Sequence, residues 1–148
     1  MTVTFFGHRD APTHTYELLK KTIIYLIEKH NADNFYVGNH GNFDSMALRA
    51  LQELQVKYKH IRYAVVLAYM PSDNSNNKIY IPDFITTLMP DGIESAPPKY
   101  AITKRNKWMI ENSDFVITYV KFSFGGAATF QNIAMKKEKT IINIYQKL

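Results

Sequence analysis

The sequence contains no cysteine. Disulfide bonds, thiolate metal sites and thiol nucleophiles are therefore excluded. It also has no apolar run near the roughly 20 residues that a membrane-spanning helix needs. Its first residues lack the basic and apolar regions of a secretory signal. From these absences we expect a cytoplasmic protein with no membrane partner.

Runs of like charge are missing as well. The formal net charge is +5 and the pI about 9.3, but the basic residues are separated along the chain and no aromatic–basic pattern accompanies them. This spacing argues against nucleic acid as a partner, although the charge keeps a nucleic-acid-binding protein as a further alternative. The five histidines show no paired metal-ligand spacing, so we expect no metal and no other cofactor.

The sequence does contain a regular alternation of apolar and amphipathic segments. Alternating strands and helices favour right-handed crossovers between parallel strands. With 148 residues, 46% of them hydrophobic, the chain fits one core. We therefore predict a single α/β domain over residues 1–148, with a Rossmann-like, doubly wound, mainly parallel sheet and helices on both faces. The predicted strands cover residues 2–6, 35–37, 61–69, 115–120 and 140–145, and the predicted helices cover about 13–30, 43–54, 99–112 and 127–137.

The segment 70–98 departs from this alternation because it is rich in proline and asparagine. Connections of this length without secondary structure are uncommon and often functional. Two interpretations stay open, a lid that covers a ligand and a variable surface insertion.

In parallel sheets, ligands bind outside the carboxyl ends of the strands, and three predicted strand ends carry glycine. The motif Gly7-His8-Arg9 offers a tight turn, a guanidinium for phosphate or carboxylate, and an imidazole that can donate a proton. The segment from Gly38 to Asp44 opens a helix whose N–H groups favour an anion. Asp44 either accepts a bond from a ribose hydroxyl or caps the helix.

The third glycine motif is Gly125-Gly126-Ala127-Ala128-Thr129, which lies between a predicted strand and a predicted helix. Paired glycines followed by small residues at a helix start allow main-chain N–H groups to contact a phosphate. The motif is neither the spaced-glycine dinucleotide fingerprint nor a P-loop, which would end in Gly-Lys-Ser/Thr.

Four motifs in one order resemble the SLOG superfamily, which includes the lonely-guy phosphoribohydrolases and the DprA/Smf proteins. They are Gly7-His8-Arg9, the turn from Gly38 to Asp44, the Arg-Asn-x-x-Met of residues 105–109, and Gly125-Gly126. The chain is most similar to the small YpsA-like branch. The resemblance implies a Rossmann-like fold and a site for a nucleotide or a nucleotide derivative.

The resemblance gives less support to catalysis. In lonely-guy enzymes a glutamate of the glycine loop works with the arginine that corresponds to Arg105, and its position here is Asn132. An amide cannot do a carboxylate's work beside an oxocarbenium-like centre. The leading hypothesis is therefore a nucleotide-binding module: a sensor, a sequestering protein or a regulatory protein. The alternative is a nucleoside-monophosphate N-glycosidase or a deoxyribosyltransferase-like enzyme, with Asp44 or Glu111 as the carboxylate.

We also expect a homodimer or larger oligomer, because SLOG relatives commonly pair and ten tyrosines and nine phenylalanines suit an interface as well as a core. Trp108 can pack on a base or a partner, and packing in the core or in a dimer is favoured. The predicted ligand-binding residues are Gly7, His8, Arg9, Gly38, Asn39, Gly41, Phe43, Asp44, Arg105, Asn106, Met109, Gly125, Gly126, Ala127 and Thr129.

Overall fold

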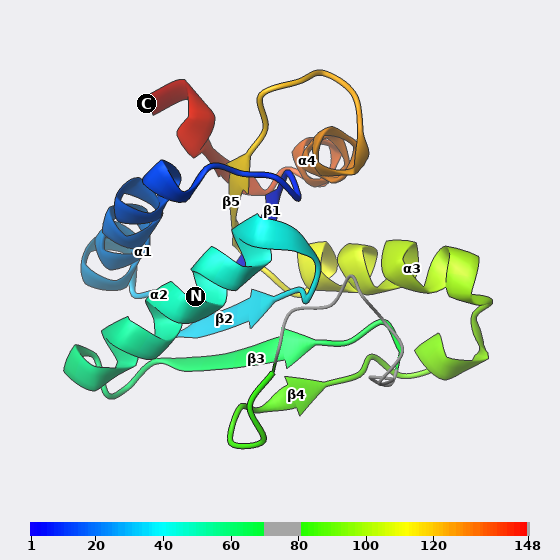
Figure 1. The fold of residues 1–148 in the computed structure, drawn as a ribbon, viewed down its shortest axis with the longest axis horizontal. Coiled ribbons are helices and arrows are strands. Elements are labelled where there is room, and N and C mark those ends of the chain that lie inside the picture. The colour runs from blue at the N-terminus through cyan, green and yellow to red at the C-terminus, as the bar shows by residue number, and fades with distance from the viewer. Residues whose placement is uncertain (70–80, 148) are drawn as a thin grey trace.

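The protein is built on one six-stranded sheet in which every described pairing is parallel (Figure 1). The computed structural model describes residues 1–69 and 81–147. The strand order is β4-β3-β2-β1-β5-β6. The strands are β1 (Thr2–Gly7), β2 (Asn34–Val37), β3 (Arg62–Val66), β4 (Thr87–Leu88), β5 (Phe115–Tyr119) and β6 (Thr140–Asn143).

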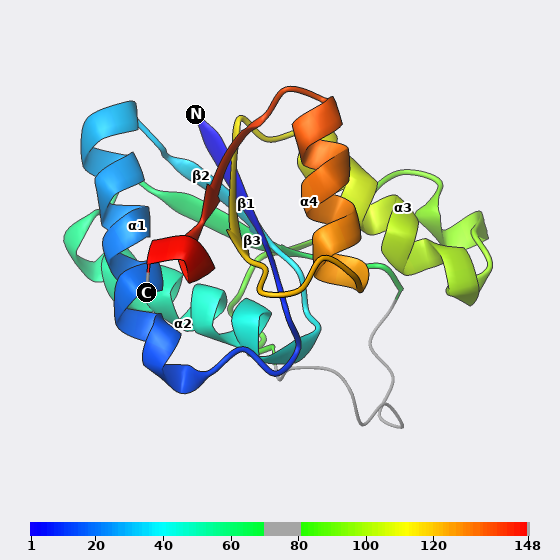
Figure 2. The same cartoon turned by 90° about the horizontal axis from the view of Figure 1, so that it is seen from above.

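Helices cover both faces of this sheet. Figure 2 shows α1 and α2 on one side of the strands and α3 and α4 on the other. None of the helices in the described ranges 1–69 and 81–147 is long and apolar enough to cross a bilayer. The predicted Rossmann-like, doubly wound fold is confirmed. The helices are α1 (Tyr16–His30), α2 (Gly41–Lys57), α3 (Pro98–Glu111) and α4 (Gly126–Lys136).

The central strand β1 has apolar side chains on both faces, as expected for a parallel strand covered by two helical layers. Phe5 packs near Phe35 on the side of α1 and α2, with ring centroids 6.4 Å apart. Phe6, the next residue, points to the other face and stacks on Phe130 of α4 at 5.6 Å. Successive side chains of a strand alternate between faces, so β1 belongs to both cores.

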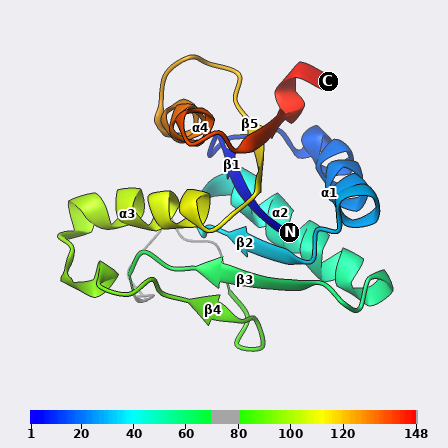
Figure 3. The same cartoon turned by 180° about the vertical axis from the view of Figure 1, so that it is seen from behind.

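The direction in which strands are added reverses at β1. The strands β2, β3 and β4 follow one another outward on one side, as Figure 3 shows from behind, whereas β5 and β6 lie on the other side. Because all the strands are parallel, the loops after β1, β2 and β5 meet at one edge of the sheet. Gly7, at the end of β1, pairs with Tyr119, at the end of β5. This reversal is the point at which open α/β sheets bind ligands.

Two predicted strands are too long. The predicted 61–69 strand ends at Val66, because Ala68 leaves the ladder and packs with Ile93 and Ala101. The predicted 140–145 strand ends at Asn143, whose side-chain oxygen accepts the N–H of Val120 at 3.0 Å. A 3-10 turn then follows over Ile144–Lys147.

The segment 70–98 is in part an edge of the sheet. Strand β4, which the sequence analysis missed, pairs with β3, and the N–H of Leu67 donates to the carbonyl of Leu88 at 2.8 Å. Ile85 and Ile93 are buried beside it. Residues 70–80 lie outside the described residues, so the choice between a lid and an insertion is not tested there.

Candidate functional site

A cavity of about 260 Å³ opens at the carboxyl edge of the sheet, where β1 meets the loops that follow β1 and β2. It reaches from the first turn of α2 to α3 and to the first turns of α4, so four segments far apart in the sequence form its wall. The lining residues are Phe5, Phe6, Gly7, His8, Arg9, Gly38, His40, Asp44, Ile102, Arg105, Asn106, Met109, Gly126, Ala127 and Phe130.

Most of the residues predicted to bind a ligand lie at this cavity. Asn39, Gly41, Phe43, Gly125 and Thr129 do not line it. Whether the lining residues bind a ligand stays a prediction. The predicted residues that line it are Gly7, His8, Arg9, Gly38, Asp44, Arg105, Asn106, Met109, Gly126 and Ala127.

The sequence analysis missed five lining residues: Phe5, Phe6, His40, Ile102 and Phe130. A sequence signal was available for Ile102, the missed residue on α3. Residues spaced by three and four positions share a face of a helix, and position 102 is three before Arg105. Both phenylalanines of β1 were assigned only to the core, where they also pack.

Three of the predicted residues that do not line the cavity shape it from behind. Phe43 is fully buried, and a Cβ at Gly7 would lie 2.3 Å from its ring, so only glycine fits at position 7. Gly41 has φ +89°, and a Cβ there would lie 2.7 Å from the Cα of Arg9. Asn39 is buried, and its side-chain oxygen accepts a bond from Arg105 at 2.8 Å.

The other two lie at the start of α4. Gly125 has φ +95°, a conformation that favours glycine. The Thr129 hydroxyl donates to the Gly125 carbonyl at 3.0 Å. Within the described part of the chain, no side chain caps this N-terminus. Because Gly126 and Ala127 line the cavity, the first N–H groups of α4 are available to an anion there.

Arg105 is the most tightly held side chain of the site. It is 2% exposed, and its Nε donates to Asn106 Oδ1 at 2.7 Å. Its Nη1 donates to Asn39 Oδ1 at 2.8 Å and to the Val66 carbonyl at 3.2 Å. Its Nη2 lies 3.3 Å from His40 Nδ1. A guanidinium has five N–H groups, so these four bonds leave one that no described residue accepts.

The contact with Arg105 also determines the proton position on His40. A guanidinium only donates, so His40 Nδ1 must be the acceptor and the proton of the neutral ring is on Nε2. That nitrogen lies 3.2 Å from the hydroxyl oxygen of Tyr69. Burial lowers the pKa of Arg105, an effect that the charge of Asp44 opposes.

Asp44 lies in the first turn of α2 and lines the cavity, and its predicted bond to a ribose hydroxyl stays a prediction. Its Oδ2 accepts the N–H of His40, the residue before α2, at 2.9 Å, and the residue also lines the cavity. A Cβ at Gly38 would lie 2.7 Å from this oxygen and 3.4 Å from Cζ of Arg105. Burial raises the pKa of Asp44 to about 6, and the charges of Arg105 and Arg9 and the His40 N–H lessen the rise.

The first glycine motif supplies two different side chains. His8 Nε2 accepts the N–H of Lys121 at 2.9 Å, so its ring connects the loop after β1 to the loop after β5. Arg9 is exposed and lines the cavity. Its side chain makes no hydrogen bond or ion pair with any other residue that the structure describes. Arg9 is therefore a cation that is available to a ligand.

The two positions considered for a catalytic carboxylate besides Asp44 lie away from the cavity. Asn132 is exposed on α4. Glu111 accepts a bond from Lys137 at 3.4 Å and lines a second cavity, of about 210 Å³, together with Trp108. The Trp108 ring packs 5.0 Å from that of Tyr36.

The fold and the position of the cavity define a Rossmann-like α/β protein with a candidate site at the reversal of strand order. No family model and no curated protein sequence matches the chain. Its structure is similar to that of DNA processing protein A (DprA) from Streptococcus pneumoniae, with a TM-score of 0.66 and 17% identity. The match covers 95% of this chain and 48% of DprA, so the chain spans about half the length of that protein.

This likeness shows a shared fold and supports the SLOG resemblance at that level. The finer assignment to the YpsA-like branch stays a prediction. Self-association also stays a prediction.

The inference against nucleic acid as a partner is wrong, because the fold matches that of a DNA-processing protein. The inference depended on the separation of basic residues along the sequence. Folding removes that separation: Arg9 and Arg105 line one cavity. The aromatic–basic pattern reported as missing is present in the loop after β5, where Lys121, Phe122 and Phe124 are all exposed.

Proposed function

We propose that the protein binds a nucleotide-type ligand through a phosphate group in the 260 Å³ cavity. One observation carries this proposal: Arg9 and the uncapped N-terminus of α4 face the same cavity. A guanidinium that no described residue engages and the open N–H groups of a helix start are both ligands for phosphate oxygens. The DprA-like fold is consistent with a DNA-processing or nucleotide-related module.

The remaining walls suit the rest of a nucleotide. Asp44 offers a carboxylate to a sugar hydroxyl, and the one N–H of Arg105 that no described residue accepts adds a donor. Ile102, Met109 and Phe130 give an apolar surface for a sugar or base. The volume of about 260 Å³ lies just below the range of small-ligand pockets, which starts at about 300 Å³, so the cavity has room for no more than one nucleotide unit.

The direct test is calorimetric titration of the protein with mono-, di- and cyclic nucleotides and ADP-ribose-type nucleotides. Arg9→Ala should weaken binding of the best ligand by about 1.5–3 kcal/mol, the range for hydrogen bonds to charged groups. The control is Arg62→Ala, an exposed arginine at the start of β3 and thus at the opposite edge of the sheet. No binding of any nucleotide at millimolar concentration, or equal losses in the two variants, would contradict the proposal.

Asp44 favours a second candidate function, cleavage of the N-glycosidic bond of nucleoside monophosphates. It is the one carboxylate among the lining residues, and a pKa of about 6 suits a group that transfers protons near neutral pH. The test is an assay for free base released from AMP, GMP, CMP and their deoxy forms. Turnover that Asp44→Asn abolishes would make the protein an enzyme; its absence in the unaltered protein would leave the binding function.

A further inference from the structure

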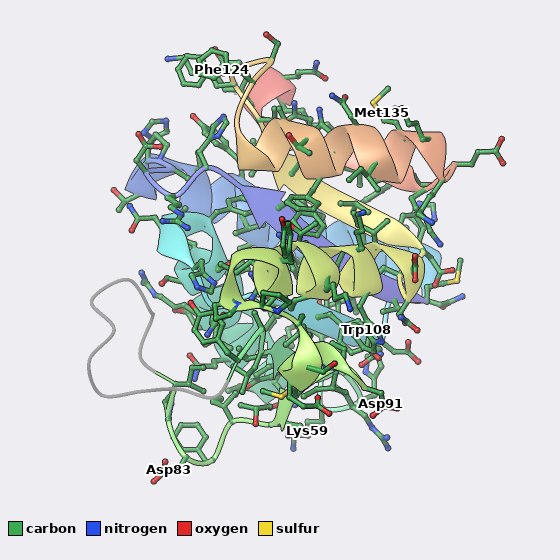
Figure 4. All side chains as sticks on the ribbon, turned by 90° about the vertical axis from the view of Figure 1, so that its right-hand side faces the viewer. Lys59, Asp83, Asp91, Trp108, Phe124 and Met135 are labelled. Carbon is green, nitrogen blue, oxygen red and sulfur yellow. The ribbon has the colours of Figure 1, made fainter. Side chains whose placement is uncertain are left out.

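The loop between β5 and α4 presents two adjacent phenylalanine side chains to solvent. Phe122 is 45% exposed and Phe124 is 70% exposed. Their rings stack on each other with centroids 5.2 Å apart and an interplanar angle of 23°. In Figure 4 the labelled Phe124 lies at the outer edge of the molecule, beyond the end of α4. Single exposed apolar residues are common on protein surfaces, but two stacked rings form a flat apolar surface.

The loop that carries this ring pair is held in place beside the cavity. His8, which lines the cavity, accepts the N–H of Lys121 at 2.9 Å. The His8 ring centroid is 5.5 Å from that of Phe122. The loop then leads through Gly125 into Gly126 and Ala127, which also line the cavity. The ring pair is therefore an ordered neighbour of the proposed phosphate site.

The charge at the ring pair is positive. Lys121 Nζ lies 5.4 Å from the ring centroid of Phe122, and Arg9 lines the adjacent cavity. Proteins that bind single-stranded nucleic acid combine cationic groups for the backbone with aromatic rings on which bases stack. A purely apolar partner would leave the charge of Lys121 unmatched.

We propose that Phe122 and Phe124 form a stacking platform for an unpaired base of a single-stranded nucleic acid, next to the phosphate held in the cavity. This inference rests on the proposed function, because it uses the same phosphate site. The cavity suits one nucleotide unit, and the platform lies outside it. Only a ligand longer than one nucleotide reaches both, so the occupant is a nucleotide chain and not a free mononucleotide.

The test compares an oligonucleotide with a mononucleotide in the same variants. Binding of a fluorescently labelled single-stranded oligonucleotide of about ten nucleotides, within the site size of such proteins, is measured by anisotropy. Phe124→Ala and Phe122→Ala should each lower this affinity about tenfold and leave the affinity for a mononucleotide unchanged. Phe124→Trp should retain oligonucleotide binding. The matched control is Phe84→Ala, which alters a phenylalanine that is 79% exposed and does not line the cavity.

The outcomes separate this inference from the proposed function. If Arg9→Ala leaves mononucleotide binding intact while Phe124→Ala weakens oligonucleotide binding, the phosphate site in the cavity is contradicted, and only the stacking of a base on the two rings is retained. If the two phenylalanine variants bind the oligonucleotide as the unaltered protein does, the platform is overturned. Equal affinity for a duplex of the same sequence also overturns it. So does light scattering in which Phe124→Ala abolishes self-association without changing oligonucleotide affinity, because the rings then bind a second copy.

Discussion

At the scale of single residues, the site depends on Gly38. This glycine follows β2 and lies where the Asp44 carboxylate and the Arg105 guanidinium converge. Its conformation is not one reserved for glycine, because its φ is not positive. Lack of space is the reason for glycine here: a Cβ 2.7 Å from Asp44 Oδ2 would push this carboxylate from its position, whereas Arg105 Cζ, at 3.4 Å, would be in ordinary contact.

Gly38→Ala should therefore destabilise the protein by about 1–3 kcal/mol, the usual cost of overpacking. The measurement is the free energy of unfolding in urea. Gly126→Ala is the control, since a Cβ there meets nothing within 4 Å and the position begins a helix. A Gly38→Ala protein as stable as the Gly126→Ala protein would show that the Asp44 side chain is not fixed.

Arg105 and Arg9 should differ in their contribution to the stability of the fold. Four bonds hold Arg105 to its neighbours, so Arg105→Ala leaves buried acceptors such as Asn39 Oδ1 without a donor. We expect a loss of about 3–5 kcal/mol in unfolding free energy, as when one member of a buried charged pair is removed. Arg9→Ala should leave stability unchanged. Arg105→Lys should not restore it, because an ammonium cannot reproduce the planar fork; restoration would contradict the network.

The raised pKa of Asp44 predicts that stability and anion affinity depend on pH. Its pKa of about 6 is above the ordinary 3.8, so between these values the folded protein keeps a proton that the unfolded chain releases. The stability from this group is full below pH 3.8 and is lost as the pH rises through 6. Protonation also removes a negative charge that faces Arg9 and Arg105, so anion affinity should rise as the pH falls through 6.

Calorimetric titration with a cyclic uridine monophosphate, whose single phosphodiester charge is constant over this range, isolates the effect. In Asp44→Asn, the part of the rise that is due to the carboxyl group should disappear. A profile with the same slope in both proteins would show that the rise does not come from Asp44.

At the scale of secondary-structure elements, the sequence pattern predicts the observed structure where an element is long and its apolar residues share one face. Position 102, Arg105 and Met109 show the spacing of one helical face on α3, and this face meets the cavity. Strand β4 could not be predicted in this way, because two residues show no period. The end of β3 was missed since Ala68 is as apolar as the strand before it and only its contacts with Ile93 and Ala101 distinguish it.

The glycine motifs were predictable for the same reason: parallel strands place the residues that follow them at one edge. The hydrogen bonds that hold the Arg105 side chain were not predictable, because its acceptors come from the loop after β2, from Val66 of β3 and from Asn106. Neither was the exposure of Phe122 and Phe124. A short aromatic segment fits the end of a strand equally well, and only the folded chain shows that the rings remain in solvent.

At the scale of the whole molecule, the effect of the net charge of +5 on binding depends on where the basic side chains lie. Binding of a single strand should weaken as salt rises, with a slope of about −0.7 in log affinity per phosphate contacted. Lys121→Gln should make this slope shallower by about 0.7, or one contact. The control is Lys59→Gln; Lys59 is exposed in the turn before β3, and Figure 4 shows it on the opposite side of the view from Phe124. Equal slopes in the two variants would remove Lys121 from the binding surface.

The central position of β1 also affects how the chain folds. β1 is made long before β5, with which it pairs, and the N–H of Thr2 donates to an Asp114 side chain that is 112 residues away in the sequence. Closing so long a loop is slow, because chain entropy opposes it before any contact compensates. Until β5 arrives, one edge of β1 is open and the cavity lacks the wall that α4 supplies. The site is therefore among the last parts of the molecule to assemble, and a folding intermediate with α1 and α2 already docked would not yet bind a ligand there.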